Sequence, residues 1–161
     1  MRKKQVLFNA NLDGLDKKPE WYTIVTLYNY EDMVANKINE MSMMDEYKDF
    51  IIEAFPGVQK VKEHYINKKG EYCTKIKSKK ILSNYCFVKC YITPEIWNTL
   101  TNITGFGSII CISGRPVSTS ESEINKVKDM MKSIEVISGT EKEQDKIIEI
   151  LGKEYVANYI Y

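Results

Sequence analysis

The sequence lacks the features that mark common enzymes, secreted proteins and membrane proteins. Its one histidine, His64, stands in a lysine-rich segment and is interpreted as an exposed surface residue. No glycine-rich phosphate loop, HExxH helix or GxSxG elbow occurs. No apolar run approaches the length of a membrane span, and the apolar stretch after the initial MRKK is too short for a secretory signal. We therefore expect a soluble cytoplasmic protein that is not an enzyme and does not bind membranes.

The sequence also has few cysteines and a net charge close to zero. The 23 basic and 22 acidic side chains nearly cancel, so the overall charge predicts neither a nucleic acid nor an acidic partner. The four cysteines form no disulfide pattern. Cys86 and Cys90 would lie about 13 Å apart on one strand, which is too far to share a metal ion. We expect free thiols in a reducing compartment, no metal and no cofactor.

One stretch dominates what is present, residues 81–92, which read ILSNYCFVKCYI. Its β-branched and aromatic residues alternate, as is typical of a strand with two different faces. One face is small and apolar and suits the side of a sheet that helices cover. The other is an aromatic row with one lysine, which suits a partner better than water. The first face holds Cys86, Val88, Cys90 and Ile92, and the second holds Tyr85, Phe87, Lys89 and Tyr91.

The patterns along the chain predict an α+β domain with the element order βαβββαβα. We expect a mainly antiparallel sheet of four to five strands, flanked by three helices. The first helix is predicted from Tyr30 to about Tyr47, the second after a Thr93 cap, and the third from a capping box at Ser120 through Ile134. Strands are predicted at 21–28, 50–65, 72–79, 81–92 and 108–112. The second of these is broken by Pro56-Gly57 into the pieces 50–55 and 58–65.

The two ends of the chain are expected to lie outside this domain. Residues 1–20 mix Lys, Asn, Asp, Gly and Pro without a period and are predicted to be a mobile leader. The domain itself is predicted at 21–134. Residues 135–161 are predicted to form a tail that adds one helix, capped by Thr140 and Glu143.

Lysines crowd the predicted hairpin within residues 60–80, around the turn Asn67-Lys68-Lys69-Gly70. Such lysines can protect a sheet edge from pairing with another strand. They can also contact phosphate groups of a nucleic acid. Both interpretations stay open, and the candidate phosphate ligands are Lys68, Lys69, Lys75 and Lys77.

The aromatic strand is compatible with the RNA-recognition motif, whose strand reads K/R-G-F/Y-G/A-F-V-x-F/Y. Residues 83–90 agree at Tyr85, Phe87 and Val88, but they lack the basic residue, the glycine and the final aromatic. The βαββαβ order of that fold also lacks the extra strand predicted here. An RRM-like module with Tyr85 and Phe87 stacking on bases of single-stranded RNA is therefore the alternative interpretation.

Five motifs in the correct order resemble the N-terminal domain of the NusG family of transcription elongation factors. The family forms are W-Y, x-x-G-x-E…V-A, F-P-G-Y-x-x-V, V-x-G-F and R-P-x-P-I…E-V. The matching residues here are Trp21-Tyr22, Tyr28-Asn29-Tyr30-Glu31 with Val34-Ala35, Leu82-Ser83-Asn84-Tyr85-Cys86-Phe87-Val88, Ile103-Thr104-Gly105-Phe106, and Arg115-Pro116 with Ser120-Glu121-x-Glu123-Ile124. Asn before Tyr85, with an aromatic two residues later, resembles the specialised RfaH-type paralogues. Asn29, Leu82 and Ser83 depart from the family's usual Gly, Phe and Pro.

The resemblance implies a transcription elongation or antitermination factor that binds RNA polymerase and promotes processive elongation. In the family, a hydrophobic depression around this strand docks on the clamp helices of the largest polymerase subunit. The positions that match those contacts are Tyr30, Leu82, Tyr85 and Phe87. The residues that match the segment facing the second jaw of the cleft, or the non-template DNA strand, are Asn98, Thr99 and Thr101.

The resemblance also bears on the hairpin and on the C-terminal tail. If the hairpin lysines contact phosphate, the hypothesis is that they lie near upstream DNA in the complex. The residues after 134 are too few and too helical for the KOW barrel that follows this domain in the family. Trp97 is either a core residue or part of the second contact. We expect the protein to act as a monomer.

Overall fold

The computed structural model describes residues 10–152 and 159–160, which form two compact units. The first, here called the sheet–helix unit, lies within residues 1–57 and 82–128. The second, here called the hairpin unit, lies within residues 58–81 and 129–161. In the described part of the chain, no helix is long and apolar enough to cross a membrane.

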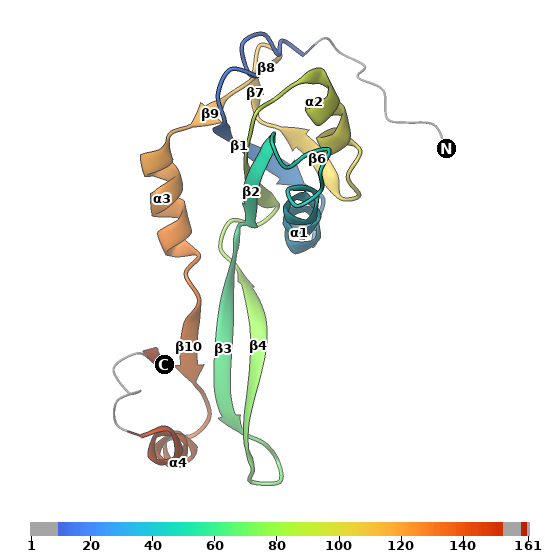
Figure 1. The fold of residues 1–161 in the computed structure, drawn as a ribbon. Helices are drawn as coiled ribbons and strands as arrows, with labels where there is room; N and C mark the ends of the chain where they lie inside the picture. Colours follow the sequence, from blue (N-terminus) through green and yellow to red (C-terminus); the bar gives the residue numbers. More distant parts are fainter. Residues whose placement is uncertain (1–9, 153–158, 161) are drawn as a thin grey trace. The chain divides into compact units, whose positions relative to one another are not determined.

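The sheet–helix unit is built on an antiparallel sheet with the strand order β2-β5-β1-β6. These strands are β1 (Glu20–Thr26), β2 (Ile51–Pro56), β5 (Tyr85–Cys90) and β6 (Phe106–Ile109). The short strand β9 (Ser118–Thr119) also pairs with β1, and β7 (Cys111–Ile112) pairs with β8 (Arg115–Pro116). The helices are α1 (Glu31–Met41), α2 (Pro94–Thr101) and α3 (Glu121–Met130), shown in Figure 1. The predicted α+β class and mainly antiparallel sheet are confirmed.

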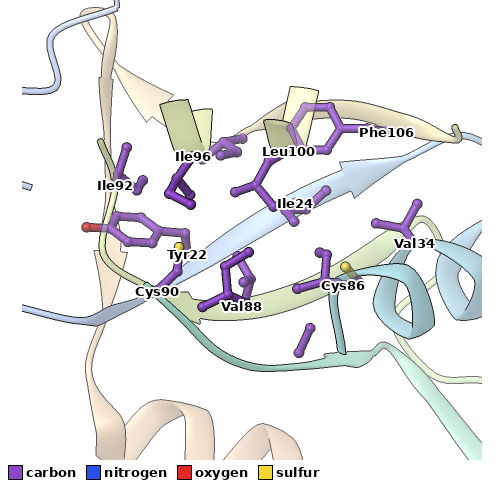
Figure 2. Close-up of a cluster of buried hydrophobic side chains, with 14 of the residues drawn as sticks. Tyr22, Ile24, Val34, Cys86, Val88, Cys90, Ile92, Ile96, Leu100 and Phe106 are labelled. Atoms are coloured by element: carbon purple, nitrogen blue, oxygen red, sulfur yellow. The ribbon is translucent and has the colours of Figure 1, made fainter. Parts of the chain in front are cut away.

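The main core lies between this sheet and helices α1 and α2 (Figure 2). Cys86, Val88 and Cys90 point into it from β5 and are fully buried, as their alternation predicts. Burial of an aliphatic side chain such as Val88 contributes roughly 1.5–3 kcal/mol. The other contributors that Figure 2 labels are Tyr22, Ile24, Val34, Ile92, Ile96, Leu100 and Phe106.

The hairpin unit is a second sheet with the strand order β11-β10-β3-β4. Strands β3 (Val58–Ile66) and β4 (Tyr72–Lys80) form the antiparallel hairpin. Strand β10 (Ile134–Ile137) runs parallel to β3 (Figure 1). Strand β11 (Tyr159–Ile160) runs parallel to β10. Helix α4 (Glu141–Leu151) begins at the predicted capping box and packs Ile147 against Ile137. The helix expected in the tail is therefore present.

A buried polar link joins three strands of the hairpin unit. His64 on β3 is 2% exposed, so its interpretation as an exposed surface residue is wrong. Its Nδ1 lies 2.8 Å from the Tyr72 hydroxyl on β4, and its Nε2 lies 3.1 Å from Glu135 Oε1 on β10. The imidazole is buried because both ring nitrogens have polar partners, which removes the penalty of burying them.

Turns cut several predicted elements short. Helix α1 ends at Met41 rather than near Tyr47, and the predicted strand at 81–92 is reduced to β5. Asn84 has φ 68° and Asn29 has φ 66°, so neither residue can continue a strand. Helix α3 ends at Met130, and Ile134 begins β10 instead of extending the helix.

The N-terminal segment differs from the expected leader. Residues 1–9 lie outside the described part. Within 10–19, Leu15 is 6% exposed and belongs to the main core cluster. Its carbonyl accepts a hydrogen bond from the Ile92 amide at 3.0 Å. This stretch is therefore part of the packing of the sheet–helix unit and not a mobile leader.

Candidate binding surface

The candidate surface is built on the turn formed by residues 82–85, which leads into β5. The amide of Asn84 donates to Glu31 Oε2 at 2.8 Å, and the carbonyl of Asn84 accepts from the Thr26 amide at 2.7 Å. The two ends of the turn are bound to Gly57, because the Leu82 amide donates to the Gly57 carbonyl and the Gly57 amide donates to the Tyr85 carbonyl. Four hydrogen bonds, to Glu31, Thr26 and Gly57, therefore hold the backbone of this turn.

Tyr85 stands at the end of this turn with 37% of its surface exposed. Leu82 is half-buried and packs against the aromatic cluster beneath the turn. Tyr30 is half-buried at the start of α1, where its ring lies against Gly105. The structure thus brings Tyr30, Leu82 and Tyr85 to the same end of the sheet, where β1 ends and β5 begins.

Gly105 leaves room for the Tyr30 ring. Its φ is 92°, and a Cβ atom at this position would overlap the Tyr30 ring. The adjoining backbone is fixed as well, because the Leu27 amide donates to the Gly105 carbonyl at 2.8 Å. Glycine is required here both for the backbone conformation and for the close approach of the ring.

Phe87, the fourth predicted contact residue, is only 6% exposed. Ile124 and Val127 of α3 pack on this face of the sheet, together with Trp21. The expectation of an open aromatic row is therefore wrong at Phe87, because a third helix covers the second face of β5. The row is accessible at Tyr85, where the strand begins.

Two aromatic residues of this face were not among the candidate site residues. The Phe55 ring stacks on Phe87 with a centroid distance of 5.0 Å, and Trp21 meets Phe55 edge-on at 5.5 Å. The sequence places Phe55 and Trp21 on two separate predicted strands, and Trp21 also matches a family motif. Their meeting depends on the pairing of β2 and β1 with β5, which no local pattern gives.

Charged side chains surround this aromatic cluster. The Trp21 indole N–H donates to Glu121 Oε2 at 3.0 Å, and Lys89 lies 3.5 Å from the same oxygen. The Lys128 ammonium lies 4.9 Å from the centre of the Trp21 ring and 3.1 Å from Glu53 Oε1. These contacts fasten α3 to the sheet at the rim of the cluster, where cation–π attraction adds to the ion pairs.

The predicted second contact lies on α2. Trp97 is 4% exposed and is a core residue, so its role in a second contact is not supported. Thr99 lines a groove of about 500 Å³ between α1 and α2, together with Met33 and Met44. The backbone carbonyl of Asn98 accepts hydrogen bonds from the Thr101 hydroxyl and the Asn102 side chain. The Thr101 hydroxyl is therefore already hydrogen-bonded within this segment.

The candidate phosphate ligands lie in the hairpin unit. Lys68 and Lys69 are exposed on the β3–β4 turn, which the Asn67 side chain closes by accepting from the Lys69 and Glu71 amides at 2.9 Å. Lys75 and Lys77 on β4 lie 3.5 and 3.3 Å from Glu63 Oε1. One carboxylate therefore offsets part of the positive charge on this edge strand.

The cysteines of β5 carry no reactive chemistry. Burial, with the nearby Glu31 carboxylate, raises the pKa of the Cys86 thiol to about 12, and burial raises the pKa of Cys90 to about 12. All four cysteines are free. In the described residues, no group of three or more His, Cys, Asp or Glu side chains could hold a metal ion.

Comparison with known proteins assigns the chain to a family. The family model described as "Transcription termination factor nusG" matches residues 19–128. "Transcription termination/antitermination protein NusG" of Rickettsia bellii is 27% identical over 113 residues, covering 68% of this chain and 55% of that protein. The same-named protein of Rickettsia typhi is 29% identical over 112 residues, covering 67% and 54%. The chain thus spans about half the length of these curated relatives.

A solved structure titled "Domain interaction in Thermotoga maritima NusG" is 18% identical, with a TM-score of 0.48, and covers 70% of this chain and 56% of that one. The matched residues 19–128 include all five of the motifs noted in the sequence, from Trp21 to Ile124. Asn29 and Asn84, which both stand where the general family motifs have glycine, have positive φ, and asparagine is the usual substitute for glycine in that conformation. With the family model matching well over half of its residues, the chain belongs to the NusG family.

Proposed function

We propose that this protein is a transcription elongation or antitermination factor that binds RNA polymerase through the 82–85 turn. The observation that carries the proposal is the exposed Tyr85 on a turn whose backbone is held by hydrogen bonds to Glu31, Thr26 and Gly57, in a chain of the NusG family. A preorganised aromatic side chain loses little conformational freedom on binding, which is typical of interface hot spots.

The proposed partner is the pair of clamp helices in the largest polymerase subunit. Tyr85 and Leu82 would contact the helical tip, and Tyr30 would form the rim of the contact. Phe87 would act from below, because its ring supports the turn through Phe55 and Leu82. Holding the clamp closed would favour the elongating state of the polymerase, an effect on conformational equilibrium and not on chemistry.

A second contact is proposed on α2, through Asn98, Thr99 and Thr101. Its partner would be the opposite jaw of the polymerase cleft or the non-template DNA strand. The four candidate phosphate ligands, Lys68, Lys69, Lys75 and Lys77, are proposed to lie near upstream DNA. Lys68 and Lys69 are the stronger candidates, because Glu63 lies beside Lys75 and Lys77.

The alternative, an RRM-like RNA-binding module, is less well supported. Base stacking on this face would require open rings at Tyr85 and Phe87. The Phe87 ring is covered by α3, so a base could not reach it in this arrangement. Short single-stranded RNA is therefore expected not to quench the tryptophan fluorescence of the protein.

The proposal can be tested by measuring the affinity of the protein for bacterial core RNA polymerase and for an isolated clamp-helix fragment. Tyr85→Ala is expected to weaken both affinities by roughly tenfold or more, as loss of a hot-spot aromatic does. Tyr91→Ala is the matched control, because Tyr91 follows the opposite end of the same strand. Its affinities should equal those of the wild type.

The outcomes separate the function from the site. A wild-type protein that binds neither polymerase nor fragment would show that the proposed function is wrong. Equal binding of the wild type and Tyr85→Ala would reject the site alone.

In elongation complexes with upstream duplex, a variant with Lys68, Lys69, Lys75 and Lys77 changed to Gln should bind more weakly than the wild type. The difference in affinity should become smaller as the salt concentration rises.

A further inference from the structure

We infer that Glu31 is a positioning residue for the polymerase-binding surface: its buried carboxylate fixes the backbone of the 82–85 turn and so sets the direction of Tyr85. The inference rests on the proposed function, because it assigns a role within that binding surface. Glu31 itself would not touch the polymerase. It would act through the turn, from a position 53 residues earlier in the chain.

The first step of the argument is the burial of Glu31. The side chain is only 2% exposed, and a carboxylate in such a place is unfavourable unless it is compensated. Two features of the structure compensate it. Glu31 stands in the first turn of α1, where the helix dipole favours negative charge, and its Oε2 accepts the Asn84 amide hydrogen at 2.8 Å.

The second step concerns the backbone that Glu31 holds. Asn84 has φ 68°, a left-handed conformation that a residue with a side chain adopts reluctantly. Such a conformation persists where the surroundings over-determine it. Here Glu31 binds the amide of Asn84 while the Thr26 amide binds its carbonyl at 2.7 Å. Tyr85 is the next residue, so fixing the Asn84 peptide groups fixes where the Tyr85 side chain begins.

The third step separates Glu31 from a general helix-stabilising acid. Asp32 also stands in the first turn of α1, and it is less buried than Glu31. One acid would be enough to complement the helix dipole, which does not require a buried residue. The position of Glu31 is instead explained by the Asn84 amide. Its neighbour Tyr30 packs against Gly105. The start of α1 therefore contacts the 82–85 turn through Glu31 and the loop at Gly105 through Tyr30.

The test compares Glu31→Gln, Glu31→Ala and the matched control Asp32→Asn. We expect Glu31→Ala to weaken binding to core RNA polymerase by roughly tenfold, a typical coupling between neighbouring residues. Glu31→Gln keeps an acceptor oxygen at the same place and should recover part of that loss. Asp32→Asn removes a charge from the same helical turn and should bind as the wild type does.

Two further readouts distinguish positioning from a general loss of structure. Hydrogen exchange of the Asn84 amide should accelerate in both Glu31 variants, while amides in the centre of β1 and β5 keep their protection. In a double-mutant cycle, Glu31→Gln should cause little further loss of polymerase affinity when Tyr85 is already alanine, because both changes act on one contact.

Three results would overturn the inference. They are wild-type affinity in both Glu31 variants, an equal loss in Asp32→Asn, or a Glu31→Gln effect that adds in full to Tyr85→Ala. If Glu31→Ala does not fold, Glu31→Gln and its cycle decide the question. A wild-type protein that binds no polymerase would reject the proposed function and the positioning role with it. Exchange of the Asn84 amide would still show whether Glu31 holds the turn.

Discussion

The two units of this protein are stabilised in different ways. The sheet–helix unit buries apolar side chains on both faces of its sheet, under α1 and α2 on one side and α3 on the other. Among its described residues, the hairpin unit has one small apolar cluster around Ile137 and Ile147, together with the buried link from His64 to Tyr72 and Glu135. Apolar packing therefore dominates the first unit, and polar contacts carry more of the second.

The hairpin unit lies only partly within the match to the family model. The match to the family model ends at residue 128, whereas β10, α4 and β11 all come later. These three elements join the β3–β4 hairpin, which lies within the match, and extend it into a four-stranded sheet. The candidate polymerase-binding turn lies in the apolar unit, whose dense packing suits a surface that must present side chains in fixed positions.

The largest expected effect is on the aromatic layer under α3. Trp21→Ala removes a side chain that is 1% exposed and contacts Phe55, Lys128 and Glu121. We expect the free energy of unfolding to fall by about 3–5 kcal/mol, as for other buried tryptophans. Ile112→Ala is the control, since Ile112 is 68% exposed and its loss should change stability by less than about 0.5 kcal/mol.

Urea unfolding followed by circular dichroism measures both variants. Equal, small losses would mean that α3 does not close an apolar layer over Trp21 and Phe87. Apolar burial would then stabilise only the face of the sheet that α1 and α2 cover.

Each unit has a glycine with a left-handed backbone in one of its turns. Gly105 in the sheet–helix unit and Gly70 in the hairpin unit have φ 92° and 79°. Alanine at either site should lose roughly 1–2 kcal/mol of stability from the left-handed backbone alone. At Gly105 the new Cβ would also overlap the Tyr30 ring, whereas nothing lies within 4 Å of a Cβ at Gly70.

Gly105→Ala is therefore expected to be more destabilising than Gly70→Ala by about 1–3 kcal/mol, the usual penalty for overpacking. Chemical denaturation of the two variants side by side gives this difference directly. Equal losses would show that the Tyr30 ring moves aside without cost, and that the turn beside Tyr30 is less tightly packed than its contacts indicate.

The sequence predicts the fold wherever a local pattern is enough. Alternation identifies the buried face of β5, because a strand has a strict two-residue period. Local caps are also found correctly: the Thr93 hydroxyl accepts the Ile96 amide at the start of α2, and the capping box of α4 is complete. Each of these features depends on residues a few positions apart.

What escapes prediction depends on residues far apart in the chain. The segment at 134–137 continues an apolar helical period, and only its parallel pairing with β3 makes it a strand. His64 is buried by partners on two other strands. The aromatic row is read correctly as one face, but its cover by α3 is a tertiary contact. In the candidate site, the bond from Asn84 to Glu31 spans 53 residues and has no local signal.

The smallest predicted effect tests whether the hairpin unit depends on charge. Glu63 lies between β4 and β10, beside Lys75 and Lys77 at 3.5 and 3.3 Å. The Ser138 hydroxyl, with the ammonium groups of Lys77 and Lys75, holds the pKa of Glu63 below its ordinary value. A carboxyl with a lowered folded-state pKa stabilises the fold above its unfolded-state pKa, and this stabilisation is lost as pH falls through the folded-state pKa.

Glu63→Gln should therefore reduce the stability of the hairpin unit at neutral pH, and the difference from the wild type should disappear in acid. The loss at neutral pH should stay below about 1 kcal/mol, because both lysines are half-exposed and salt screens such pairs. Hydrogen exchange of the β3 and β4 amides at the two pH values measures it. Glu71→Gln, in the exposed β3–β4 turn, is the control. A difference that persists unchanged in acid would mean that Glu63 stabilises the sheet by packing, and that the contrast between a polar and an apolar unit does not extend to this carboxylate.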